Sequence, residues 1–244
     1  MAVSGGKDSL SLWHILAEMG YQVDGFHLDL GLGDYSRRSW EKVESFAGRA
    51  GLRLIITEAG QETGLNVAEL AAKRKTCSVC GQIKRYIFNR TAWQRGYLAL
   101  ATGHNLDDEA ARLLGNTLKC KTDFLARQRP VLPAHRERLV RRVKPLFRLT
   151  EKEVAAYAFL LGIDYLAEEC PHASGATSLV YKRAINLLEE ASPGSASQLY
   201  LGFIQRAGSL FEDEAKALLS SCQQCGQLTP AEVCSYCRLI GRAS

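Results

Sequence analysis

The feature that most restricts the fold of this chain is a short polar loop near its start, residues 4–9, with the sequence Ser-Gly-Gly-Lys-Asp-Ser. Apolar residues lead into the loop, and apolar residues with helical spacing follow it from Leu10 to Leu16, which predicts a strand, a tight turn and a helix. Glycines let a ligand approach the backbone, and the start of a helix attracts anions. The loop therefore predicts a phosphate site, with a plain polar turn as the alternative, and it is too short to be a Walker A loop. Its candidate phosphate-binding residues are Ser4, Gly5, Gly6, Lys7, Asp8 and Ser9.

The segments after this loop continue an alternating pattern. Strands are expected over 21–28 and 52–57 with a helix over 35–50 between them, which makes the order βαβαβ. This order predicts an α/β fold with a doubly wound parallel sheet, whose ligands bind at the carboxyl ends of the strands. The first strand usually lies in the middle of such a sheet, yet only three residues precede the loop, so we expect that residues are missing before Met1. Further helices are expected over 67–73, 82–95 and 150–161, and further strands over 97–101 and 143–146.

The composition limits the class of protein. A chain of 244 residues can bury one substantial core and a small appendage. It has no apolar run long enough to cross a membrane and no secretory pattern at its start, which predicts a soluble, cytoplasmic protein. The net charge of +5 permits a nucleic-acid partner without requiring one.

Three regions are expected along the chain. Residues 1–176 form the α/β domain, residues 177–220 a helical extension, and residues 221–244 a cysteine-rich tail. The extension is expected to contain helices over 180–190 and 197–219.

A second glycine turn follows the strand expected over 97–101. It has the sequence Thr-Gly-His-Asn-Leu-Asp-Asp-Glu over residues 102–109 and leads into a helix that ends near Leu118. Two carboxylates at this helix start, Asp107 and Asp108, can hold magnesium beside the phosphates of the first loop. The alternative is an acidic helix start that the helix dipole favours. His104 is either a proton carrier or a turn histidine with a structural hydrogen bond.

The cysteine-rich tail contains two Cys-x-x-Cys pairs separated by eight residues. This spacing can place four thiolates around zinc in a closed, structural site. Four unrelated cysteines are the alternative. The predicted zinc ligands are Cys222, Cys225, Cys234 and Cys237.

The other four cysteines are spaced differently. Cys77 and Cys80 form one Cys-x-x-Cys pair, and Cys170 lies far along the chain in an expected loop. These three favour a shared site, either an iron–sulfur cluster with one open iron or a persulfide relay. The alternatives are buried thiols, half of a zinc site or a disulfide, and for the isolated Cys120 a buried thiol is the preferred interpretation.

The segment from Lys119 to Arg142 is basic, rich in proline and expected to be irregular. A solvated surface explains such a run of charge. A flexible basic loop beside an active site could also hold RNA phosphates.

Together these motifs resemble the PP-loop ATP pyrophosphatases, in the branch that thiolates tRNA and that includes the 2-thiocytidine and 2-thiouridine synthetases. Within this branch the chain is most similar to the iron–sulfur sulfurtransferases that act on 5-methyluridine in the T-loop of tRNA. Besides the two turns and the tail, the resemblance includes the helix segment Lys84-Arg85-Tyr86 and the run Glu-Glu-Cys-Pro over 168–171.

The resemblance implies that ATP lies between the two turns and that Cys77, Cys80 and Cys170 hold a [4Fe–4S] cluster. It also implies a homodimer, and sulfur delivery by the thiocarboxylate of a ubiquitin-like carrier protein. The family's zinc knuckle at the N-terminus is absent from this sequence. The implied catalytic residues are Lys7, Asp8, Cys77, Cys80, Asp108 and Cys170. Beyond the first loop, the implied nucleotide-binding residues are His27, Gly103, His104, Asn105, Asp107 and Asp108, although packing at the strand end is the alternative for His27.

The implied reaction begins with transfer of AMP from ATP to the 2-oxygen of a tRNA pyrimidine, which turns that oxygen into a good leaving group. Sulfide then attacks carbon 2 and AMP departs. Alternatives are thiolation of a wobble uridine or an anticodon-loop cytidine, and a PP-loop reaction that uses a persulfide relay. A non-catalytic module that binds zinc and RNA is disfavoured by the intact lysine and acidic residues in both turns.

Overall fold

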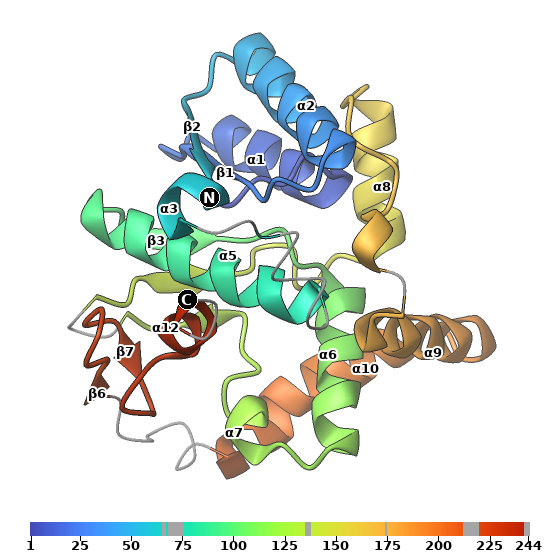
Figure 1. Ribbon diagram of the computed structural model, residues 1–244. Helices are drawn as coiled ribbons and strands as arrows, with labels where there is room; N and C mark the ends of the chain where they lie inside the picture. The colour runs from blue at the N-terminus through green and yellow to red at the C-terminus, as the bar shows by residue number, and fades with distance from the viewer. Residues whose placement is uncertain (65–66, 68–75, 135–137, 174, 212–219, 242–244) are drawn as a thin grey trace.

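The computed structural model of the chain describes residues 1–64, 67, 76–134, 138–173, 175–211 and 220–241 (Figure 1). Its centre is a largely parallel sheet built around the first three residues. Ala2 pairs in parallel with Phe26, and its N–H donates to the carbonyl of Ala101 at 3.0 Å. The first segment is therefore the middle of the sheet, where the βαβ pattern predicted it. The strands are β1 (Gly25–Asp29), β2 (Leu54–Glu58), β3 (Ala99–Ala101), β4 (Val131–Leu132) and β5 (Arg141–Val143).

The strand order is β2–β1–first segment–β3–β5–β4. Gly25 of β1 is level with Leu54 of β2, and Ala99 of β3 is level with Arg141 of β5, both in parallel. Only β4 among the described strands of this sheet runs antiparallel to its neighbour. The prediction of a doubly wound parallel sheet is confirmed.

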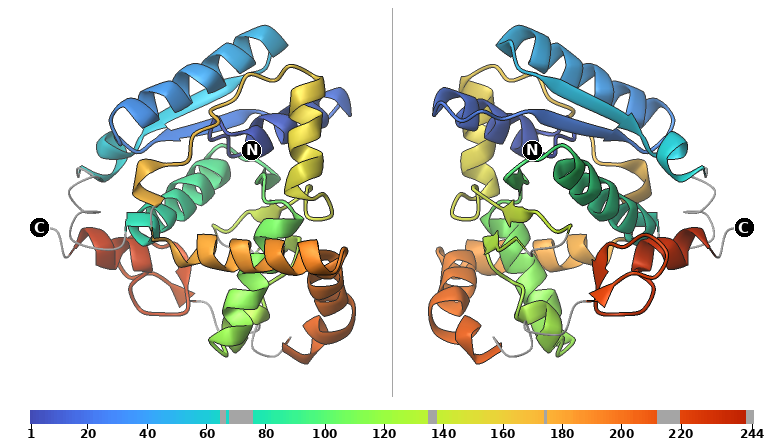
Figure 2. Two further views of the ribbon diagram at one scale, coloured as in Figure 1. Left: turned by 90° about the vertical axis from the view of Figure 1, so that its right-hand side faces the viewer. Right: turned by 90° about the vertical axis from the view of Figure 1, so that its left-hand side faces the viewer.

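Helices cover both faces of the sheet (Figures 1 and 2). One face packs against α1 (Lys7–Glu18), α2 (Asp34–Ala50) and α8 (Glu151–Leu160), and the buried Trp13 lies in that core. The other face packs against α5 (Thr76–Gln94), which contributes Ile83 and Ile87. None of the described helices is both long and apolar enough to cross a membrane.

Three expected elements have wrong boundaries. The strand expected over 21–28 begins only at Gly25. The helix expected over 82–95 begins at Thr76, so the Cys77–Cys80 pair lies in its first turn instead of preceding it. The strand expected over 143–146 covers 141–143 because Pro145, which has no N–H, cannot continue the ladder. The helix expected over 67–73 falls almost entirely outside the described residues.

The C-terminal region packs on α6 (Leu106–Leu118). α9 (Thr177–Ala191) crosses α6, and α10 (Ser195–Gly202) lies beside both (Figure 2). The single helix expected over 197–219 is wrong for its described part, because a π-helix (203–207) and a 3₁₀ turn (208–211) follow α10. The division of the chain at residues 176 and 220 stays a prediction.

Small elements complete the chain. Cys120 is exposed and adopts φ of 49° just after α6, so the buried-thiol interpretation is wrong for it. A left-handed residue at this position is a common way for a helix to end. The remaining elements are α3 (Ala59–Thr63), α7 (Thr122–Leu125), η1 (Pro171–Ala173), β6 (Ser220–Ser221), β7 (Leu228–Thr229) and α12 (Ser235–Ile240).

Candidate active site

The first predicted phosphate loop joins the central segment to α1. Gly5 has φ of 75°, and a Cβ there would lie 2.8 Å from the carbonyl oxygen of Ser39 on α2, so both backbone and space require glycine. Ser9 Oγ accepts the N–H of Ser4 at 3.1 Å and donates to the carbonyl of Gly6 at 2.9 Å, which fixes the loop. Gly6 is the N-cap of α1 and has no side chain that could accept a hydrogen bond from the helix. The first backbone N–H groups of α1 are therefore open to an anion.

The second turn lies directly against the first. A Cβ on Gly103 would come within 3.0 Å of backbone atoms of Asp8 and Ser9. Asn105 donates from Nδ2 to Asp8 Oδ1 at 3.1 Å and, with Asp108, forms the capping box that starts α6. The structure thus brings both predicted turns together at the carboxyl edge of the sheet.

A chain of alternating charges crosses the site. Lys7 Nζ contacts Asp8 Oδ2 at 3.0 Å and Glu151 Oε1 at 2.7 Å. Lys182 Nζ contacts Asp108 Oδ1 at 2.8 Å and the other oxygen of Glu151 at 2.9 Å. Burial alone would raise the pKa of Glu151, but its hydrogen bonds from Lys7 and Lys182 lower it, so the carboxylate stays ionised.

Glu151 and Lys182 were missed by the sequence reasoning. Glu151 could have been found, because the capping box of Thr150 and Glu153 starts α8 just after β5, at the same edge of the sheet. Lys182 has no local pattern to mark it. It reaches the site only because α9 folds back across α6.

Three other predicted residues have different surroundings. Asp107 is buried and accepts the backbone N–H of Glu151 at 2.7 Å, so it caps α8. Of the two aspartates, Asp108 stays the candidate magnesium ligand. His104 Nδ1 lies 2.9 Å from the hydroxyl of Thr102, and desolvation, reinforced by Arg112, lowers its pKa to about 4. This histidine is therefore neutral at pH 7, and its hydrogen bond with Thr102 agrees with the structural interpretation.

His27 lies beneath the first loop. Its Nδ1 is 3.0 Å from the carbonyl of Val3, and burial lowers its pKa. Its Nε2 is buried and has no partner within the described part of the chain. His27 is thus held against the segment that enters the first loop. Nucleotide contact by His27 stays a prediction.

Cys77, Cys80 and Cys170 converge from two distant segments. Cys77 Sγ lies 3.7 Å from the carbonyl of His172, two residues beyond Cys170. Burial raises the pKa of Cys80, and the neighbouring Cys170 and Cys77 raise it further, against an opposing effect of Lys84. Three cysteines brought together from two segments form the donor set of an iron–sulfur cluster with one open iron, so these residues fit such a group.

The cysteine trio lies close to the first loop. The N–H of Leu166 donates to the carbonyl of Gly5 at 2.8 Å, so the segment leading to Cys170 starts on that loop. The pKa of Tyr35, at the start of α2, is raised first by burial and then by Cys170. The trio and the phosphate loop therefore share one edge of the sheet.

The tail forms a compact four-sulfur site. The sulfurs of Cys222, Cys225, Cys234 and Cys237 all lie within 4.8 Å of one another, and all four thiols are free. Backbone N–H groups, that of Cys234 first, outweigh the effect of burial and lower the pKa of Cys222 to about 6. Four converging thiols, one of them readily ionised, fit the tetrahedral site that zinc requires.

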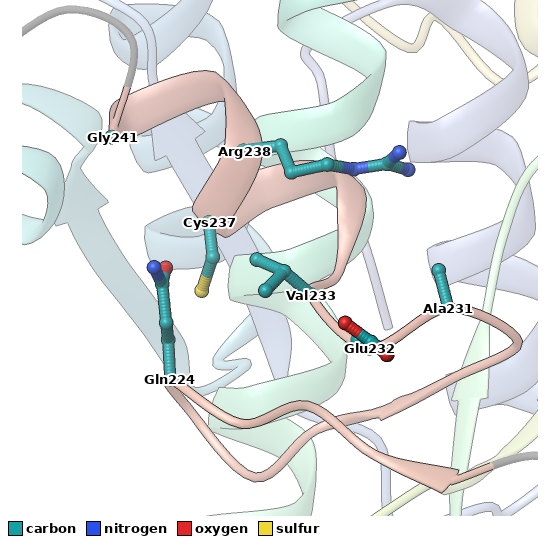
Figure 3. A pocket seen from close by; sticks show the side chains of 7 residues that line it. All are labelled: Gln224, Ala231, Glu232, Val233, Cys237, Arg238 and Gly241. Carbon is teal, nitrogen blue, oxygen red and sulfur yellow. The ribbon is translucent and has the colours of Figure 1, made fainter.

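This knuckle packs on the helix that carries two of the trio. Tyr236 of α12 stacks on Tyr86 of α5, with ring centroids 3.6 Å apart and planes 5° from parallel. A pocket of about 470 Å³ opens in the knuckle, where Gln224 and Val233 lie on either side of Cys237 (Figure 3). It is lined by knuckle residues alone, so it is separate from the nucleotide turns.

The comparison with known families matches this geometry. The family model described as the PP-loop domain matches residues 1–177, which include both turns and the cysteine trio. The chain belongs to the PP-loop family.

Relatives of known activity indicate the branch of the PP-loop family to which this protein is similar. It is 46% identical over 241 residues to the tRNA-5-methyluridine(54) 2-sulfurtransferase of Thermus thermophilus, covering 98% of this chain and 75% of the relative. It is 44% identical to the enzyme of the same name from Thermotoga maritima, covering 98% and 79%. The chain is thus an enzyme of the tRNA sulfurtransferase kind.

A solved structure supports the same placement. The U34-tRNA thiolase NcsA from Methanococcus maripaludis, which was solved with its [4Fe–4S] cluster, superposes with a TM-score of 0.84 at 28% identity. The match covers 99% of this chain and 79% of that one. The predicted fold, including the C-terminal helices and the knuckle, is confirmed.

Proposed function

We propose that this protein is an ATP-dependent tRNA sulfurtransferase that replaces the 2-oxygen of 5-methyluridine in the T-loop with sulfur. The observation that carries the proposal is the convergence of Cys77, Cys80 and Cys170 beside the two nucleotide turns. The choice of base follows the relatives, since the chain is 44–46% identical to two methyluridine enzymes but only 28% identical to the U34 thiolase.

The two turns would hold ATP. The open N–H groups at the start of α1 and the ammonium of Lys7 suit the phosphates. Asp8 and Asp108 offer carboxylate oxygens, which fit magnesium bound to those phosphates. A tightly held triphosphate would present its α-phosphorus to the 2-oxygen of the base, so positioning supplies much of the catalysis.

The cysteine trio would hold a [4Fe–4S] cluster with one iron free. Such a cluster, when bound, supplies a site that holds sulfide next to the activated carbon. The two segments of the chain fix the three thiols on one side, while Lys84 adds positive charge near Cys80. A persulfide relay through the same cysteines is the second candidate mechanism, because Cys77 is exposed.

A group of arginines would hold the tRNA. Arg85 and Arg142 have no carboxylate partner among the described residues, and Arg112 only approaches Glu109, at 3.9 Å. Desolvation lowers the pKa of Arg85 and Arg142, although Arg85 is solvent-accessible. Repulsion from Arg112 lowers the pKa of Arg85 further, and repulsion from Arg85 does the same for Arg142. Unpaired guanidiniums suit RNA phosphates.

The proposal includes three further features of the family. Sulfur would arrive on the thiocarboxylate of a ubiquitin-like carrier protein, the enzyme would act as a homodimer, and the reaction would take place in the cytoplasm. Zinc would occupy the four-sulfur knuckle.

The test uses the full chain, reconstituted anaerobically with iron and sulfide. The wild type is given ATP, sulfide and tRNA that carries 5-methyluridine but not its 2-thio form. It should yield 2-thio-5-methyluridine, detected by nucleoside mass spectrometry, together with pyrophosphate and AMP. Asp8→Ala should abolish pyrophosphate release. Cys77→Ala should lose iron while retaining one zinc. Release of orthophosphate, or thiolation at the anticodon instead, would contradict the proposal.

A further inference from the structure

Lys182 enters the nucleotide site from outside the matched PP-loop domain. It lies on α9, just beyond the region that the family model covers, 1–177. α9 approaches α6 closely because Gly115 has no side chain: a Cβ there would meet the ring of Tyr181 at 2.6 Å. The buried Ile185, one turn further on, fixes the same helix against α6. The packing of α9 on α6 therefore fixes the position of Lys182.

The contacts of Lys182 mirror those of Lys7. Each ammonium contacts one aspartate, Asp108 or Asp8, and each contacts a different oxygen of Glu151. A lysine ammonium has three N–H donors, so each retains one donor for a further acceptor. The two carboxylate oxygens of Glu151 therefore bridge Lys7 and Lys182, as two oxygens of a pyrophosphate group would.

The charge balance of this group favours an incoming anion and cation together. Three carboxylates face two ammoniums, which gives a formal net charge of −1 in the absence of ligand. Magnesium is usually bound by one or two carboxylates together with substrate phosphates. Magnesium on Asp8 and Asp108 would release both lysines toward the phosphates that the metal accompanies.

We propose that Lys182 is a catalytic residue that binds the pyrophosphate part of ATP together with Lys7, with Glu151 occupying that place when the nucleotide is absent. In the adenylation step the 2-oxygen of the base forms a bond to the α-phosphorus. The bond from the α-phosphorus to the α–β bridging oxygen breaks, and its electron pair leaves on pyrophosphate. Lys182 stabilises that developing charge. This inference depends on the proposed function only for the identity of the acceptor.

The decisive measurement is calorimetric binding of magnesium pyrophosphate and, separately, of AMP to the full chain without tRNA. Lys182→Gln should weaken pyrophosphate binding roughly 10- to 100-fold, because one charge-assisted contact is lost. It should leave AMP binding unchanged, and Lys182→Arg should recover most of the loss. The matched control is Arg183→Gln, the next residue on α9, which is exposed and has no ion pair within the described residues.

A second variant separates ligand binding from a structural tie. Glu151→Gln removes the carboxylate that competes with phosphate for both lysines, so pyrophosphate binding without magnesium should tighten. Equal pyrophosphate binding by Lys182→Gln and wild type, or an equal loss of AMP binding, would overturn the inference. A wild type that binds pyrophosphate and responds to these variants, but thiolates no tRNA, would overturn the proposed function and leave this inference standing.

Discussion

The contact between the two nucleotide turns can be tested by a single methyl group. In Gly103→Ala the new Cβ would lie 3.0 Å from the carbonyl carbon and oxygen of Asp8 and from the nitrogen of Ser9. Favourable separations of such atoms are about 3.5–4.0 Å, so the turns must move apart by roughly half an ångström. All three atoms belong to the backbone, so no side chain can rotate away. Gly103 does not need a left-handed conformation, and the effect is therefore steric.

The magnitude follows from this displacement. Overpacking of this kind costs about 1–3 kcal/mol of folding free energy. A misplacement of about 1 Å in an active site can cost roughly 100-fold in rate, so half that distance should lower kcat/KM for ATP by about 10-fold. The assay is pyrophosphate release with saturating tRNA, together with urea unfolding of the same sample.

The matched control is Gly48→Ala. Gly48 is exposed on α2, and a Cβ there would meet no atom within 4 Å. Alanine should stabilise that helix by up to about 1 kcal/mol and leave activity unchanged. Wild-type activity and stability in Gly103→Ala would show that the two turns are not in close backbone contact.

Three further predictions concern the surroundings of the site. Lys144→Met removes the lysine that pairs with the carboxylate of Glu109, which is 0% exposed. The free energy of unfolding, measured in urea, should fall by about 3–5 kcal/mol. A loss below about 1 kcal/mol would show that the ion pair is dispensable. The pKa of His104 is about 4 in the folded protein against 6.5 ordinarily, so the unfolded state takes up the proton first and stability should decline as pH falls from 6.5 to 4. His104→Gln should flatten that part of the curve, and an unchanged slope would exclude this histidine as its source. A chelator that removes the metal proposed for the knuckle should abolish the near-ultraviolet circular dichroism of the stacked tyrosines. The control variant Tyr236→Leu should lack that signal from the start. A signal that survives chelation would show that the stack does not need the metal.

Local patterns predicted the sheet and both turns because each depends on short-range rules. The glycine loop, the capping boxes and the alternation of strands and helices are all readable within about ten residues. The central place of the first segment followed from the usual order of strands in a doubly wound sheet. These rules also predicted which edge of the sheet would hold the ligand.

What failed depends on distant packing. The start of α5 at Thr76 could not be inferred from Cys77 and Cys80, since cysteine is a weak helix former. Lys182 has an ordinary helical neighbourhood, and only the close approach of α9 to α6 brings it to Asp108. Likewise, Cys120 is exposed in a left-handed conformation after a helix, which composition does not reveal.

The stacking of Tyr236 on Tyr86 has a consequence for how the enzyme would mature. The buried cluster that contains Cys80 also contains Cys222, Cys234 and Cys237, so one apolar core supports both sulfur sites. Zinc, which needs no reductant or assembly scaffold, could bind early and hold α5 in place. The iron–sulfur group would then be inserted into a helix start that is already ordered. We therefore expect metal insertion to be sequential, with zinc-depleted protein accepting iron slowly and in low yield.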